Sequence, residues 1–129
     1  MKIIYCITKA DNGGAQTHLI QLANHFCVHH DVYVIVGNHG PMIEQLDARV
    51  NVIILEHLVG PIDFKQDILA VKVLAQLFSK IKPDVIHLHS SKAGTVGRIA
   101  KFISKSKDTR VVFTCLLYTS PSPRDSWAS

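Results

Sequence analysis

The sequence PDVIHLHSSKAGTVG occupies residues 83–97 and changes its hydrophobic pattern halfway along. Pro83 ends the segment before it, and residues 84–89 then read as a buried strand. Ser90 or Ser91 can cap a helix, in which apolar residues recur at spacings of three and four. A strand that leads directly into a helix indicates part of a parallel βαβ unit.

The same alternation runs through most of the chain. The expected strands are residues 2–8, 31–36, 50–55, 84–89 and 110–114, with helical patterns between them. This predicts an α/β fold: a Rossmann-like, doubly wound parallel sheet of about five strands, in the order 3-2-1-4-5 counted along the chain. We expect ligands at the carboxyl ends of the strands where this order reverses, between the loops at residues 9–14 and 89–94.

Apolar spacing also predicts which helix faces turn inward. For the helix that Asp63 can cap, the expected face is Ile68, Leu69, Val73, Leu74 and Leu77. For the helix after residue 90, the expected inward residues are Val96, Ile99, Ala100 and Ile103, with Phe102 close to that side.

Composition fits one packed domain: 129 residues, of which 47% are hydrophobic. No apolar run approaches the roughly 18–20 residues of a membrane span, and the apolar start is too short for a signal peptide, so we expect a cytoplasmic protein. Three cysteines without a CxxC spacing indicate neither a disulfide framework nor a zinc site.

Charge is unevenly distributed. Residues 1–64 hold three basic and six acidic side chains, whereas residues 65–110 hold ten basic and three acidic ones. Arg98, Lys101 and Lys105 share one helix face, which is either simply solvated or in contact with anionic lipid headgroups. Nucleic acid is disfavoured, because aromatic side chains are not interleaved with these basic residues.

Two glycines, Gly13 and Gly14, stand between the first expected strand and its helix. They let the backbone approach a ligand at a helix N-terminus that favours anions, or they make only a tight turn. The dinucleotide fingerprint G-x-G-x-x-G and the P-loop lysine are both missing, which disfavours a nicotinamide cofactor and a nucleotide triphosphatase.

His87 and His89 fall on one face of the expected strand 84–89. No third ligand has suitable spacing, so we interpret them as one packed histidine and one at the crevice rim, without a metal. Residues 90–98 suit a phosphate or a sugar hydroxyl, or form an ordinary capped helix in which Gly94 and Gly97 permit close packing.

In order and spacing, several of these segments resemble the N-terminal domain of glycosyltransferase family 4 enzymes. The matching pieces are residues 2–5, 13–16, 31–34, 83–94, 97–98 and 111–114, so the resemblance covers residues 1 to about 115. It implies a two-domain GT-B enzyme that moves a sugar, without a metal or other cofactor, from a nucleotide-diphosphate sugar to a glycan or lipid-linked acceptor. Synthesis of a cell-surface polysaccharide is the implied setting.

The resemblance also implies roles for particular residues. Gly13 and Gly14 would approach the donor phosphates or sugar, and His89 and Lys92 would line the acceptor side. Related enzymes often act on lipid-linked acceptors at the inner membrane face, which would give the basic face of Arg98, Lys101 and Lys105 a membrane contact.

The chain departs from the family after Thr114. Leu116 stands where many members carry the histidine of a Thr-x-His-Gly stretch, and no donor-binding C-terminal domain follows. Residues 115–129 resemble translated adapter DNA, so we expect an incomplete domain at 1–114, a non-native or disordered tail at 115–129, and no activity from this fragment. The alternative is a non-enzymatic doubly wound module that binds a phosphorylated ligand or a partner.

Overall fold

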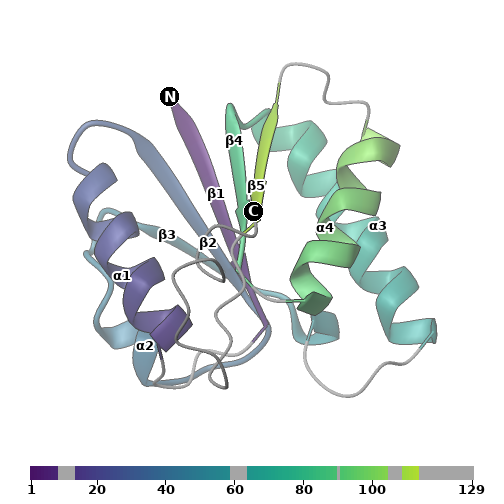
Figure 1. Ribbon diagram of the computed structural model, residues 1–129, viewed down its shortest axis with the longest axis horizontal. Coiled ribbons are helices and arrows are strands. Elements are labelled where there is room, and N and C mark those ends of the chain that lie inside the picture. The colour runs from purple at the N-terminus through teal and green to yellow at the C-terminus, as the bar shows by residue number, and fades with distance from the viewer. Residues whose placement is uncertain (9–13, 59–63, 90, 105–108, 114–129) are drawn as a thin grey trace, which may run out of the picture.

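The computed structural model describes residues 1–8, 14–58, 64–89, 91–104 and 109–113. Its centre is a five-stranded sheet in the order β3-β2-β1-β4-β5, with every neighbouring pair parallel (Figure 1). The strands are β1 (Lys2–Ile7), β2 (Asp31–Val36), β3 (Asn51–Ile54), β4 (Val85–Leu88) and β5 (Arg110–Phe113). The predicted fold class and strand order are therefore confirmed.

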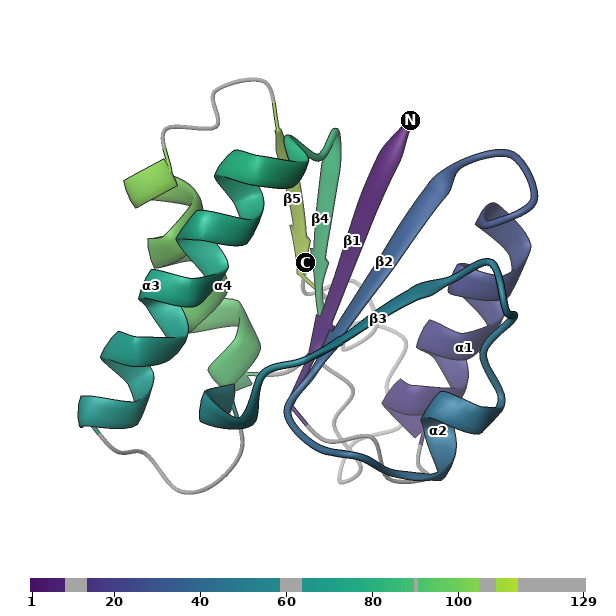
Figure 2. The ribbon, with the colours of Figure 1, turned by 180° about the vertical axis from the view of Figure 1, so that it is seen from behind.

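Helices cover both faces of this sheet. They are α1 (Gly14–Phe26), α2 (Pro41–Glu44), α3 (Phe64–Ile81) and α4 (Ser91–Ser104), with a short 3-10 helix, η1 (Glu56–Leu58), that the sequence pattern did not predict. Figure 1 shows α1 and α2 on one side of the sheet and α3 and α4 on the other, and Figure 2 shows the same layers from behind. None of the described helices is long and apolar enough to cross a bilayer.

Each face of the sheet has its own hydrophobic core. Alternate residues of β1 divide between them, because successive side chains of a strand point to opposite faces. Tyr5 packs in the core under α1, whereas Cys6 packs in the core under α3 and α4. Cys27 is also buried, so both of these cysteines are core residues.

The amino ends of three strands are tied together at Asp84. Its carboxylate accepts a hydrogen bond from the Lys2 backbone N–H at 2.8 Å, and its own N–H donates to the Lys2 carbonyl at 2.8 Å. The Arg110 N–H donates to the Asp84 carbonyl at 3.0 Å. Asp84 thereby aligns β1, β4 and β5, so that their carboxyl ends reach the opposite edge together.

The predicted inward face of α3 is partly wrong. Ile68 and Leu69 are exposed. The residues that α3 buries are Ala70, Leu74, Ala75, Phe78 and Ile81. Helix α3 packs on the sheet with the side that carries Phe78, a large and fully buried side chain. In this orientation Ile68 and Leu69, near the start of the helix, face away from the core.

The predicted face of α4 is also partly wrong: Val96 and Ala100 are buried as predicted, but the other residues of that face are not. Ile99 and Ile103 are 46% and 55% exposed, and Phe102 is 86% exposed instead of close to the core. The residues that α4 turns inward are small or compact: Ala93, Val96, Gly97 and Ala100. A Cβ on Gly97 would lie 2.5 Å from Leu88 Cδ2, so close contact between α4 and β4 selects this face. Close packing at Gly97 is thus confirmed.

Candidate functional site

Gly14 and His89, two of the predicted site residues, lie at the edge of the sheet that is formed by the carboxyl ends of its strands. β1 and β4 are parallel neighbours, α1 begins at Gly14 soon after β1, and His89 directly follows β4. The His89 N–H donates to the Cys6 carbonyl at 2.9 Å, which fixes the backbone of His89 against the end of β1. The prediction that the glycine turn and His89 share one edge is confirmed for Gly14, whereas Gly13 lies outside the described residues.

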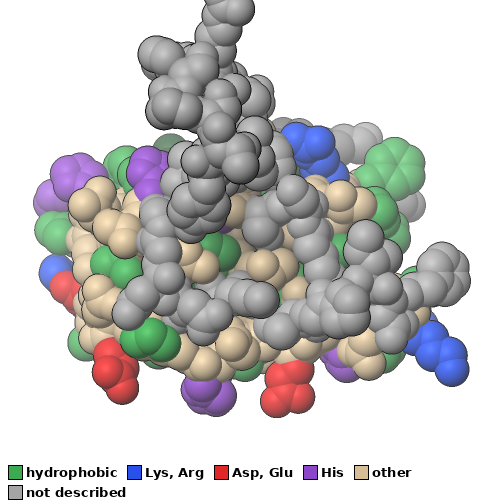
Figure 3. Space-filling model, turned by 60° about the horizontal axis from the view of Figure 1, so that its bottom comes forward, with side chains coloured by type: hydrophobic (Ala, Val, Ile, Leu, Met, Phe, Trp, Pro, Cys, Tyr) green, Lys and Arg blue, Asp and Glu red, His purple; other side chains and the backbone are tan. Residues whose placement is uncertain are grey.

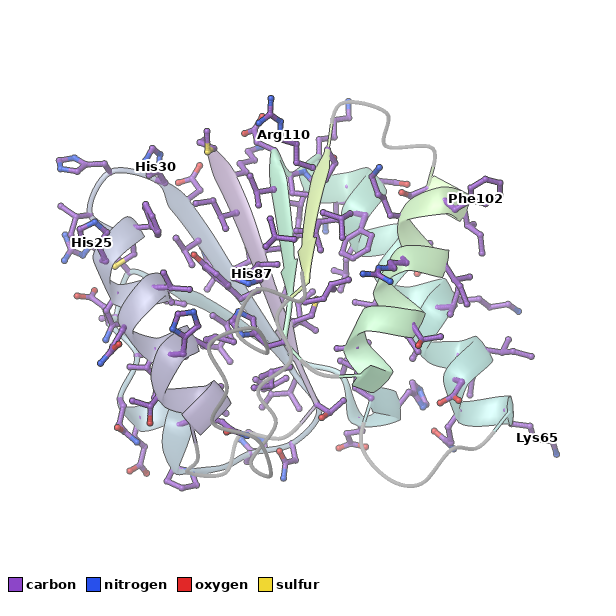
Figure 4. The ribbon with its side chains drawn as sticks, viewed as in Figure 1. His25, His30, Lys65, His87, Phe102 and Arg110 are labelled. Atoms are coloured by element: carbon purple, nitrogen blue, oxygen red, sulfur yellow. The ribbon has the colours of Figure 1, made fainter. Side chains whose placement is uncertain are left out.

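Four rings form a cluster at this edge, which we call the histidine cluster: Tyr5, His18, His87 and His89. Tyr5 and His87 are paired in the register of β1 and β4, with ring centroids 5.5 Å apart. The rings of His87 and His89 lie 4.0 Å apart, and the ring of His18 on α1 lies 5.9 Å from that of His89. In Figure 4, His87 lies inside the molecule against the strands, whereas the labelled His25 and His30 lie at the far end of α1.

Burial differs between the two histidines: His89, which follows β4, is packed as one of the pair was expected to be, and His87 within β4 is less buried. His89 is only 3% exposed, whereas His87 is half-buried. Desolvation, together with the neighbouring His18, lowers the pKa of His87 to about 4. Desolvation, together with His87 and His18, lowers the pKa of His89 to about 3. Both imidazoles are therefore neutral near pH 7.

The ring of His89 has an unsatisfied hydrogen-bonding capacity. Within the described residues, neither Nδ1 nor Nε2 has a hydrogen-bond partner, although both atoms are buried. An unpaired buried polar group costs about 1–3 kcal/mol, so such a group in a native structure calls for a ligand, a water or a specific role. The same residues contain no group of three or more His, Cys, Asp or Glu arranged to hold a metal ion.

We predict that acid destabilises the fold through His89. Its pKa of about 3 in the folded state lies below its usual 6.5, so the unfolded chain binds the proton more readily. The stabilisation is complete above pH 6.5 and is lost as the pH falls from there toward 3. Denaturant unfolding at several pH values should show a loss of up to about 1.4 kcal/mol per pH unit from this group.

A matched pair of variants isolates this effect. His89→Leu should flatten the dependence of the unfolding free energy on pH between neutral and moderately acidic solution. His29→Leu removes an exposed histidine instead and should leave the slope unchanged. Equal slopes for the wild type and His89→Leu would contradict the assignment.

His18 is the member of the histidine cluster that the sequence analysis missed. It lies in the second turn of α1 and is exposed, and only the fold brings its ring beside His89. Its position four residues after Gly14 was the available signal, because a helix that starts at the ligand edge keeps its first turns there. Lys92 lies in the first turn of α4, at the same edge, but its side chain is outside the described residues.

The predicted basic face is only partly described. Arg98 is exposed, Lys101 is half-buried, and Lys105 lies outside the described residues. Figure 3 views the molecule from the side of the carboxyl ends, and most of the visible Lys and Arg side chains lie on the α3–α4 side. Figure 4 shows Phe102 pointing outward from α4 on that side. Basic and apolar groups therefore lie together on the surface of α4.

These features define a parallel, doubly wound α/β domain in which the histidine cluster lies beside the ends of β1 and β4. Residues 12–115 match the family model described as Glycosyltransferase Family 4. The match spans most of the chain, and the protein belongs to glycosyltransferase family 4.

Solved structures with the same fold include a glycosyltransferase and a complex with UDP and glucose. A glycosyltransferase from Rickettsia africae ESF-5 superposes with a TM-score of 0.70 and 16% identity, over 94% of this chain and 31% of that chain. Anabaena HepE, in complex with UDP and glucose, superposes with a TM-score of 0.65 and 26% identity, over 96% of this chain and 32% of that one.

A curated relative carries a more specific name. The UDP-Gal:alpha-D-GlcNAc-diphosphoundecaprenol alpha-1,3-galactosyltransferase of Escherichia coli is 36% identical over 70 residues, which are 54% of this chain. The chain spans 18% of the length of that relative and about a third of each of the two solved structures.

Proposed function

We propose that this chain forms the acceptor-side half of a glycosyltransferase that moves a sugar from a nucleotide-diphosphate sugar to a glycan or lipid-linked acceptor. The observation that carries the proposal is the family match over residues 12–115 on a sheet whose ligand edge brings together Gly14 and His89. UDP and glucose bound to HepE support a nucleotide-sugar donor. The name of the Escherichia coli relative supports a lipid-linked acceptor in glycan synthesis.

The proposed roles of the residues follow from their places at this edge. Gly13 and Gly14 approach the donor phosphates or sugar, where free N–H groups at the start of α1 favour an anion. His89 and Lys92 face the acceptor. Residues 1–114 act as one unit, and the residues from 115 onward contribute nothing to the site.

A chimera tests this proposal. Residues 1–114 would be joined to the donor-binding half of HepE and assayed for transfer from UDP-glucose to lipid-linked acceptors. We expect turnover that falls at least tenfold in the variant Lys92→Ala, because a charged contact to an acceptor contributes about 1.5–3 kcal/mol. A folded chimera that binds UDP but transfers no sugar to any acceptor would count against the proposal.

The non-enzymatic alternative makes a different prediction for the same chimera. A module that only holds a phosphorylated ligand would bind that ligand through residues 1–114 and would support no transfer in any combination. The family match favours the enzyme.

We further propose that the protein works in the cytoplasm, in peripheral contact with the inner face of an anionic membrane. The contact is made by Arg98, Lys101 and Lys105, in the half of the chain that holds most of the basic residues. Phe102, Ile99 and Ile103 are exposed on the same helix, which adds an apolar surface suited to the boundary between headgroups and acyl chains.

We predict that the double variant Arg98→Ala/Lys101→Ala binds anionic vesicles about thirtyfold more weakly, since each basic residue near such a surface contributes about 1 kcal/mol. Sedimentation with phosphatidylserine-containing vesicles measures this, and raised salt should weaken wild-type binding.

The charge-matched control is Arg49→Ala/Arg110→Ala, which removes two exposed basic residues outside α4. Binding of the wild type to neutral vesicles as tightly as to anionic ones would rule out the proposed contact.

A further inference from the structure

The histidine cluster contains a buried polar side chain, His89, for which the described residues supply no hydrogen-bond partner. His89 is almost completely buried, and both of its ring nitrogens are without a hydrogen-bond partner in the described part of the chain. Its backbone is fixed to Cys6, and its ring packs against those of His87 and Tyr5, with centroids 4.0 and 5.8 Å away. The plane of the ring is therefore held by packing before any ligand arrives, which favours precise binding.

The chemistry of this ring favours one kind of ligand group. A neutral imidazole offers one N–H donor and one acceptor nitrogen. Its burial and its histidine neighbours keep it neutral, so it brings no charge with which to hold a phosphate. A hydroxyl group both donates and accepts hydrogen bonds. It can therefore pair with either the N–H or the acceptor nitrogen of the ring.

His18 adds a second element to the same place. It is exposed on the second turn of α1, and its ring lies 5.9 Å from the buried ring of His89 at a tilt of 52°. A ligand group bound at His89 on the α1 side would lie within reach of His18. The two rings thus present an inner and an outer hydrogen-bonding position on different elements of the fold.

We propose that His18 and His89 form a subsite for the hydroxyl groups of a neutral sugar ring, with His89 as its floor and His18 as a specificity-determining residue at its rim. The inference rests on the proposed function and deepens it. It assigns the sugar end of the acceptor, rather than its phosphate end, to the histidine cluster, and leaves the anionic part to other groups at the edge of the sheet.

The test uses the full 129-residue chain and needs no turnover. Ring resonances of the ¹⁵N-labelled histidines are followed while methyl galactoside, N-acetylglucosamine or inorganic phosphate is added. We expect the signals of His18 and His89 to move with at least one sugar and to stay in place with phosphate. His18→Ala should weaken the sugar affinity about three- to tenfold, the usual effect of one neutral hydrogen bond.

His29→Ala is the matched control, because it removes an exposed histidine beyond the C-terminal end of α1. His89→Gln, which keeps a donor and an acceptor, should retain part of the binding, and the backbone amide spectrum reports whether each variant is folded. Movement with phosphate at least as large as with sugar, no movement with any sugar, or an unchanged affinity in folded His18→Ala would overturn the inference.

The outcome is separable from that of the proposed function. Sugar binding at these histidines without transfer by the chimera would support the subsite and contradict the proposed enzymatic function. Transfer by the chimera together with a preference of these histidines for phosphate would do the reverse.

Discussion

The 129-residue chain, assayed alone, is expected to show no measurable transfer from any nucleotide sugar. A GT-B enzyme joins donor and acceptor in a cleft between two domains, and this chain covers only about a third of each of the two solved structures described above. Positioning of two reactants contributes about 7–11 kcal/mol to such reactions, so the rate should fall by at least about 10⁵-fold relative to a complete enzyme. Loss of the groups that stabilise the departing diphosphate lowers it further.

The test is an assay of hydrolysis and transfer of a radiolabelled UDP-sugar. It is run side by side for the 129-residue chain and for the chimera with the donor-binding half. The chimera serves as the positive control for the lipid acceptor and for the assay. Sustained turnover by the 129-residue chain alone would show that the complete catalytic machinery lies within it.

The variant Gly97→Val is expected to destabilise the domain by about 3 kcal/mol, a large part of the stability of a small domain. A Cβ at this position would meet Leu88 Cδ2 at 2.5 Å and Leu88 Cδ1 at 3.1 Å. The side chain of Leu88 is fully buried between the sheet and α4, so it can shift only by disturbing the core around it. The added methyl groups of valine must therefore displace Leu88 within the core or move α4 away from the sheet.

Gly97→Ala separates packing from helix propensity. Alanine is favoured over glycine inside a helix by about 1 kcal/mol, which offsets part of the clash, so the net loss should be smaller than for valine. The double variant Gly97→Ala/Leu88→Ala should show a favourable coupling energy in denaturant unfolding, because the shortened Leu88 makes room. Ile99→Ala, on the exposed side of α4, is the control. A Gly97→Val protein as stable as the wild type would contradict the close contact.

The strands and their order were predictable because both faces of the sheet are covered. Burial on both faces requires continuous apolar runs, such as residues 31–36 and 50–55, and the alternation with helices leaves few possible topologies. The meeting of Gly14 and His89 at one edge followed from the same topology, because they follow the carboxyl ends of neighbouring parallel strands.

The inward faces of α3 and α4 were not predictable from apolar spacing alone. Helix α4 contains two candidate faces, one with large apolar side chains and one with small ones, and the contact of Gly97 with Leu88 selects the small one. His18 was missed for a related reason. Its position four residues after Gly14 places it near the carboxyl edge of the sheet, but its proximity to His89 depends on how α1 lies across the sheet.

Strand β1 is made first, yet it pairs with β4 and hydrogen-bonds to a residue 82 positions later. While the ribosome is still adding residues 37–84, β1 can pair only with β2, and its other edge has no strand beside it. The histidine cluster is likewise incomplete until His87 and His89 emerge. A nascent chain therefore carries an open strand edge until β4 is synthesised, and pauses before residue 85 prolong the period in which that edge can pair with another molecule.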